Sequence, residues 1–138
     1  MRKINKLIIH CSASDKKEHD NPNVVREWHL DRGWHDCGYH YIITKDGSLN
    51  VMRPVSLKGA HCYGQNSYSI GICLTGLEVF TEYQLRTLKK LCLNLCEIFE
   101  LHDSVIYPHW YFNNEKSCPV FGLGEVREYV SERRYKRD

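Results

Sequence analysis

The sequence lacks the long apolar runs that mark membrane and secreted proteins. No apolar stretch in its 138 residues approaches the ~20 residues that cross a bilayer. Near the basic N-terminus, the apolar run Leu7 to Ile9 is too short for the hydrophobic region of a signal peptide. We therefore expect cytoplasmic synthesis without a signal peptide and no association with a membrane, so that a substrate outside the cytoplasm would require a separate route of delivery.

The sequence also lacks a large excess of either basic or acidic residues. Lys and Arg total 19 against 17 Asp and Glu, which gives a net charge of +2. The basic tail, residues 133–138, holds four of the positive charges and one negative charge, so the rest of the chain is close to neutral. Binding to nucleic acid through phosphates needs a broad basic face. We therefore expect no nucleic-acid partner and interpret the tail as a solvated chain end.

The cysteines do not form the framework of a disulfide-rich scaffold. There are seven, an odd number, and they are scattered along a chain long enough to fold around its own core. This usage indicates a reducing compartment. Cys92 and Cys96 could hold a metal on one face of a helix, but they lie on its apolar stripe, which favours packing in the core.

Strand and helix patterns alternate along the chain. The firmest helix begins at the capping-box sequence Thr81 to Gln84 and carries apolar residues at helical spacing as far as Phe99. Asp46-Gly47 between two short strand-like runs predicts a hairpin. The other predicted elements are strands at 6–11, 69–75 and 105–107, helices from Pro22 to about Gly33 and from Gly124 to about Tyr135, and a long surface loop at 53–67. Without repeats or a linker, this order predicts a single α/β domain spanning residues 1–138.

Reactive side chains are concentrated between Tyr107 and Pro119, where His109, Lys116 and Cys118 occur together. An imidazole and a thiol on one loop can supply two ligands of a zinc site or form a Cys–His nucleophile pair. A catalytic zinc site needs a third protein ligand, and the best candidate is His10, at the end of the first strand. The residue types leave both interpretations open. We assign no cluster to the histidines at positions 19, 29, 35 and 40.

Five motifs occur together and in order: Ile8-Ile-His-Cys-Ser-Ala13, Arg32-Gly-Trp34 with Gly38-Tyr-His40, Lys45-Asp-Gly47, Ser69-Ile-Gly-Ile72, and Lys116-Ser-Cys-Pro119 preceded by His109. The ordered set resembles the type 2 N-acetylmuramoyl-L-alanine amidases, which include phage lysozyme-amidases and animal peptidoglycan recognition proteins. The likeness runs from about Leu7 to Phe121, and the phage branch is the most similar.

The resemblance implies one zinc ion per chain, with His10, His109 and Cys118 as ligands. It also implies catalytic roles for Tyr39 and Lys116. Zinc bound by two imidazoles and a thiolate is a Lewis acid strong enough to polarise an amide carbonyl. Lys116 would place a cation near the tetrahedral oxyanion, and Tyr39 would hydrogen-bond either the attacking water or the oxyanion.

The same resemblance implies a central mixed β-sheet with helices on both faces. Its substrate would be bacterial peptidoglycan, cleaved between N-acetylmuramic acid and L-alanine of the stem peptide. We therefore expect a monomeric phage or prophage endolysin that reaches the cell wall through a holin, another export route or lysis. His61, in the 53–67 loop, is the predicted substrate-binding residue.

Two alternatives belong to other classes. The chain could be a peptidoglycan-binding recognition module without activity, although all three ligand positions are filled. It could also be a cysteine hydrolase in which Cys118 and His109 form the nucleophile pair. A chelator separates the two enzymes, because it stops zinc chemistry and leaves a thiolate nucleophile intact.

Overall fold

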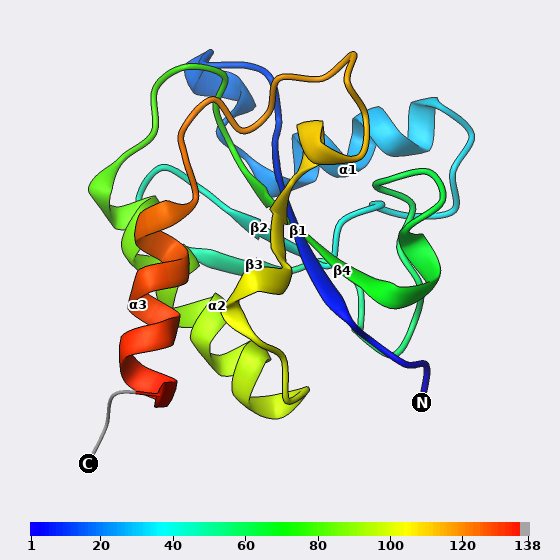
Figure 1. Ribbon diagram of the computed structural model, residues 1–138. Coiled ribbons are helices and arrows are strands. Elements are labelled where there is room, and N and C mark those ends of the chain that lie inside the picture. The colour runs from blue at the N-terminus through cyan, green and yellow to red at the C-terminus, as the bar shows by residue number, and fades with distance from the viewer. Residues whose placement is uncertain (136–138) are drawn as a thin grey trace.

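The computed structural model describes residues 1–135. Its strands form one five-stranded sheet (Figure 1). The last three residues of the predicted basic tail, 136–138, lie outside the described residues. The strand order is β3-β2-β4-β1-β5; β1, β2, β4 and β5 run parallel, and β3 is antiparallel to β2. The strands are β1 Lys6–Cys11, β2 Tyr41–Ile43, β3 Leu49–Val51, β4 Ser69–Leu74 and β5 Ile106–Pro108.

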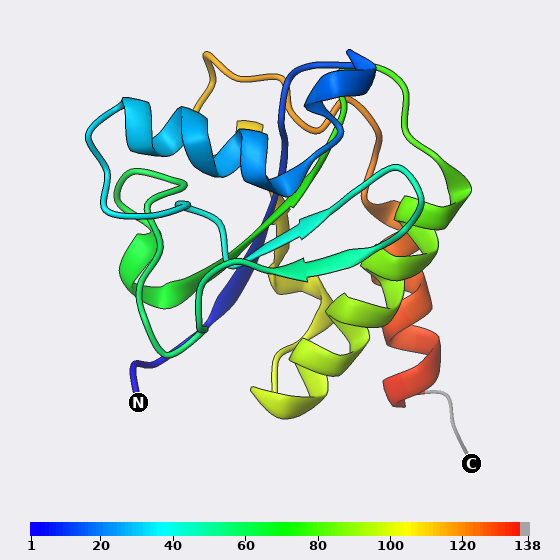
Figure 2. The same cartoon turned by 180° about the vertical axis from the view of Figure 1, so that it is seen from behind.

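Helices cover both faces of this mixed sheet, as predicted. Helix α1 lies on one face, while α2 and α3 lie side by side on the other (Figures 1 and 2). None of the helices within residues 1–135 combines the length and apolar composition that a bilayer crossing requires. The helices are α1 Pro22–Asp31, α2 Glu82–Ile98 and α3 Gly124–Tyr135, with short 3-10 helices η1 Lys17–His19, η2 Asn66–Tyr68, η3 Asp103–Val105 and η4 His109–Tyr111.

Strand β1 divides its side chains between two cores. Leu7 and Ile9 belong to the larger apolar cluster, which α2 and α3 cover. Because successive side chains of a strand point to opposite faces, Ile8 and His10 point to the α1 face. There, Val25 of α1 and Cys73 of β4 belong to a smaller cluster. His10 therefore lies on the face of the sheet that α1 covers, opposite the face that α2 and α3 cover.

The capping box of α2 forms as the sequence predicts. Thr81 Oγ1 accepts a hydrogen bond from the Gln84 backbone N–H at 3.1 Å, and Gln84 Oε1 accepts one from the Thr81 N–H at 3.0 Å. The Gln84 side chain is fully buried and also donates to the Thr75 carbonyl at 2.8 Å, which joins α2 to the end of β4. Cys92 and Cys96 are fully buried in the core, so the packing interpretation is confirmed.

The connection between β3 and β4 departs from the predicted surface loop. Residues 56–58, 63–64 and 67–68 are exposed, but Gly59, His61 and Cys62 are buried. Gly71 makes this possible, because a Cβ there would lie 2.5 Å from His61 Cγ. The missing side chain lets the loop fold against the α1 face of the sheet, directly beside His10.

Candidate active site

Two imidazoles and one thiol converge at the C-terminal ends of β1 and β5. His10 is the penultimate residue of β1, His109 begins η4, and Cys118 lies on the segment that follows. One potential ligand atom from each of the three lies within 4.8 Å of the other two. Cys118 Sγ is 3.4 Å from His109 Nδ1, and the rings of His10 and His109 are 4.3 Å apart between centroids. The structure therefore brings together the three residues predicted as zinc ligands.

Strand pairing explains why the two histidines meet. In the parallel β1–β5 pair, Ile9 is opposite Pro108, so the next residues, His10 and His109, leave the sheet at the same edge. The backbone N–H of Trp110 donates to the Cys118 carbonyl at 3.2 Å and brings the thiol back beside η4. The site thus depends on the register of the central sheet and on one loop hydrogen bond.

One nitrogen of His10 has no protein partner among the described residues. His10 Nε2 lies 2.8 Å from His61 Nδ1, whereas the buried His10 Nδ1 makes no hydrogen bond. Leaving a buried polar atom unpaired is costly, which points to a ligand at this position. In a tetrahedral zinc site, bond lengths of 2.0–2.3 Å place donor atoms about 3.3–3.8 Å apart. The ligand atoms of His10, His109 and Cys118 lie within 4.8 Å of one another, so a small movement of the side chains would bring them to these distances.

The electrostatics favour a thiolate. Close contacts with Cys11, and then with His10 and His109, hold the pKa of Cys118 far below its ordinary value, although burial opposes them. Burial lowers the pKa of His109, but hydrogen bonds to Cys118 and Cys62 outweigh it and raise the pKa to about 9. Burial lowers the pKa of His10 to about 4. Near neutral pH the metal-free site holds a thiolate, an imidazolium and a neutral imidazole.

An open cleft of about 590 Å³ lies over these groups, and the two predicted catalytic residues line it. The ring of Tyr39 packs 5.0 Å from the ring of His10 between centroids. Burial, followed by the neighbouring thiols, raises the pKa of Tyr39 well above its ordinary value, so its hydroxyl stays protonated. Lys116 is exposed on the opposite segment, and no ion pair engages it within residues 1–135.

His61, the predicted substrate-binding residue, also lines the cleft. It is only 9% exposed, and both of its ring nitrogens have partners within the protein. His61 Nδ1 lies 2.8 Å from His10 Nε2, and its Nε2 lies 3.2 Å from Ser69 Oγ. No polar ring atom therefore remains free to contact a substrate in this arrangement.

His29 and His40, which we assigned to no cluster, are both buried close to the site. His29 is buried at the cleft, where its Nδ1 accepts from the Gly38 N–H at 2.8 Å and its ring lies 5.2 Å from that of Tyr39. His40 is fully buried, and its Nδ1 accepts from the Gly71 N–H at 3.0 Å. The glycine of the motif Gly38-Tyr-His40 was the only feature of the sequence that indicated close packing around these histidines.

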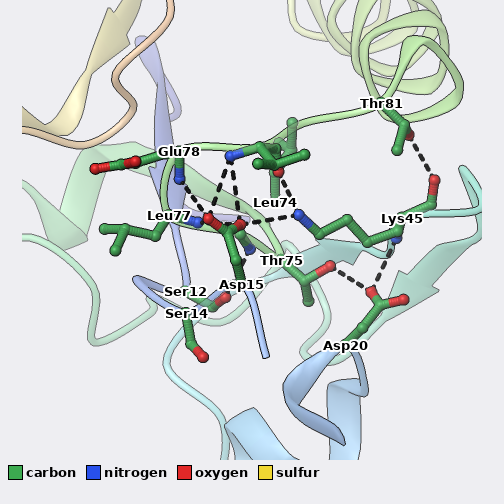
Figure 3. A network of polar contacts seen from close by, with 12 residues as sticks. Ser12, Ser14, Asp15, Asp20, Lys45, Leu74, Thr75, Leu77, Glu78 and Thr81 are labelled. Atoms are coloured by element: carbon green, nitrogen blue, oxygen red, sulfur yellow. Dashed lines mark hydrogen bonds and ion pairs between the residues drawn. The ribbon is translucent and has the colours of Figure 1, made fainter. Parts of the chain in front are cut away.

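The segment after His10 forms part of the cleft wall and is held by a network of polar contacts (Figure 3). The Asp15 carboxylate accepts from the backbone N–H groups of Leu77 and Glu78 at 2.9 Å each, and from Lys45 Nζ at 3.0 Å. These contacts lower the pKa of Asp15. They attach this wall to the residues that follow β4.

A cleft with a histidine–histidine–cysteine cluster at its floor and a tyrosine and a lysine on its walls is typical of a hydrolase. Comparisons with known proteins agree with this class. Residues 1–121 match the family model described as N-acetylmuramoyl-L-alanine amidase, and the chain belongs to this family. It is therefore an amidase, and the family resemblance and fold class predicted from the sequence are confirmed.

Individual relatives extend the comparison. The endolysin of Enterobacteria phage T3 is 34% identical over 125 residues, which cover 85% of this chain and 81% of the relative. The amidase LysC from Clostridium intestinale superposes with a TM-score of 0.84 at 26% identity, covering 94% of this chain and 87% of that one. Drosophila PGRP-LB gives a TM-score of 0.73 at 25% identity, covering 95% and 81%. A mutant of PGRP-LB is known in complex with tracheal cytotoxin.

Proposed function

We propose that this chain is a zinc-dependent endolysin of a phage or prophage. It hydrolyses the amide bond between N-acetylmuramic acid and L-alanine of the stem peptide in bacterial peptidoglycan. The observation that carries the zinc assignment is the buried, unpaired Nδ1 of His10, which belongs to the same cluster as His109 and Cys118. Family membership and the phage relatives support the substrate and the biological role.

The side chains fit the chemistry of amide hydrolysis. A zinc ion held by His10, His109 and Cys118 would supply Lewis acidity to polarise the carbonyl and lower the pKa of a water molecule. Tyr39 keeps its proton and can donate a hydrogen bond to the developing oxyanion or orient the water. Lys116 is exposed at the cleft and brings an ammonium group near the oxyanion; losing one such donor typically costs about 10² to 10³ in rate.

The shape of the site suits a polymer. The cleft is open to solvent, so part of a polymeric substrate can lie inside it while the rest extends outside. We propose that the protein acts as a monomer, with no nucleic-acid or membrane partner. It reaches the wall after release by a holin, another export route or lysis.

The test is to incubate the protein with purified peptidoglycan, with and without a chelator, and to identify the new ends by mass spectrometry. We expect metal-dependent release of stem peptides with free L-alanine amino groups. His10→Ala and Cys118→Ala should lose both stoichiometric zinc and cleavage. His102→Ala removes an exposed histidine away from the cleft and serves as the matched control. Full activity in either ligand variant would refute the proposal.

A cysteine hydrolase is the second candidate, because the Cys118 thiolate lies beside a protonated His109. Alkylation should abolish such an activity, whereas a chelator should leave it intact. The zinc enzyme responds in the opposite sense: chelation stops it and added zinc restores it. Firm wall binding without any released peptide would instead support a recognition module.

A further inference from the structure

We infer that His61 is a positioning residue that sets the tautomer and ring orientation of His10, so that the bare Nδ1 of His10 faces the metal site. The inference deepens the proposed function and rests on it for the identity of the metal. It rests for its geometry on a chain of hydrogen bonds from β4 to the site. No contact between His61 and substrate is involved.

The chain of hydrogen bonds begins at Ser69. Ser69 Oγ donates its one proton to the Gln65 carbonyl at 2.7 Å, so toward His61 it can only accept. His61 Nε2, at 3.2 Å from Ser69 Oγ, is therefore the protonated nitrogen of that ring. A neutral imidazole carries one donor and one acceptor, so His61 Nδ1 is a lone pair.

The same donor and acceptor assignment determines which nitrogen of His10 carries the proton. His10 Nε2, at 2.8 Å from His61 Nδ1, must be the donor in that contact. His10 Nδ1 is then left without a proton, and it is the buried ring atom that has no protein partner in the described chain. The opposite tautomer would turn an N–H toward Cys118 and His109. It would also require the Ser69 proton to leave the Gln65 carbonyl.

The surroundings of His61 hold it in this role. A Cβ on Gly71 would lie 2.5–2.8 Å from three atoms of the His61 ring, so the ring fills the space above that glycine. Asn66 Oδ1 accepts from the backbone N–H groups of His61 and Cys62 at 2.9 and 3.0 Å. The Cys62 thiol is in turn a hydrogen-bond partner of His109. One pair of adjacent residues thus supports both imidazoles of the site, and partners of this kind orient metal-ligating histidines.

The first measurement needs no mutation. In the metal-free wild-type protein, the ¹⁵N shifts of His10 should report a proton on Nε2 and none on Nδ1. A proton on Nδ1 would overturn the inference, whatever the metal or the activity proves to be. A protein that shows the expected tautomer but binds no zinc would instead refute the proposed function.

Variants supply the second measurement, which is zinc affinity by competition with a chelator. His61→Ala should lower the affinity about 10- to 100-fold, as loss of an outer-shell partner typically does. His61→Gln offers a carbonyl oxygen that can accept from His10 and should recover most of the loss. His102→Gln, at an exposed histidine away from the cleft, should keep the wild-type affinity. Unchanged affinity in His61→Ala, or equal losses in His61→Ala and His61→Gln, would overturn the inference.

Discussion

Replacing Gly71 by alanine tests how tightly the loop is packed against the sheet. The new Cβ would lie 2.5, 2.6 and 2.8 Å from Cγ, Cδ2 and Nδ1 of His61, all inside normal contact distance. The ring cannot easily move away, because His10 and Ser69 hold both of its nitrogens. Overpacking a core costs about 1–3 kcal/mol, and replacing glycine in a strand returns roughly 0.5–1 kcal/mol. The two effects differ by about 0–2.5 kcal/mol, and because the ring is held at both nitrogens we expect the upper part of this range, a net loss of about 1–2 kcal/mol in the free energy of unfolding.

Urea denaturation of the wild type, Gly71→Ala and Gly122→Ala measures this loss. Gly122 is the control, because a Cβ there would meet no atom within 4 Å and its φ is not positive. Gly122→Ala should stay within about 0.5 kcal/mol of the wild type. If Gly71→Ala were as stable as the control, the His61 ring would not be seated as described, and the inferred role of His61 would lose its structural basis.

Two further predictions concern protons. Zinc binding at pH 7 should release about one proton, because His10 is already neutral while the Cys118–His109 pair holds one proton until the pKa of His109, about 9. Calorimetry in two buffers of different ionisation enthalpy measures the number of protons released. A binding reaction that released no proton would contradict the assigned charges. Asp15→Asn should lower stability at pH 7, since the folded-state pKa of Asp15 is depressed and its contribution is present above the ordinary pKa. The difference in stability between the wild type and Asp15→Asn should narrow as the pH falls below 3.8 toward the folded-state pKa of Asp15. A difference that widened on acidification would contradict the described hydrogen bonds of Asp15.

Local patterns predicted most of the elements. The strand Lys6–Cys11 and the helix Gly124–Tyr135 have the bounds expected from the sequence, and the capping box at Thr81 formed both of its hydrogen bonds. These features depend on neighbours within a few residues, so periodicity and capping chemistry reveal them. Strand order could not be predicted in this way, because it depends on pairings between segments as distant as β1 and β5.

The site was predicted in part, and for a related reason. His10, His109 and Cys118 came from the family resemblance, and the structure brings them together. The contact between His10 and His61 joins residues 51 positions apart, and no spacing rule identifies it. The burial of His61 likewise depends on a missing side chain at Gly71, which becomes meaningful only once the loop and the sheet are placed together.

The order in which the site residues occur along the chain has a consequence for biosynthesis. His10 lies in the first strand, His61 follows about fifty residues later, and Cys118 lies near the start of the last helix. A nascent chain that has exposed only its first half therefore lacks two of the three predicted zinc ligands, His109 and Cys118. The three-residue cluster can be complete only after Cys118 has left the ribosome and β5 has paired with β1.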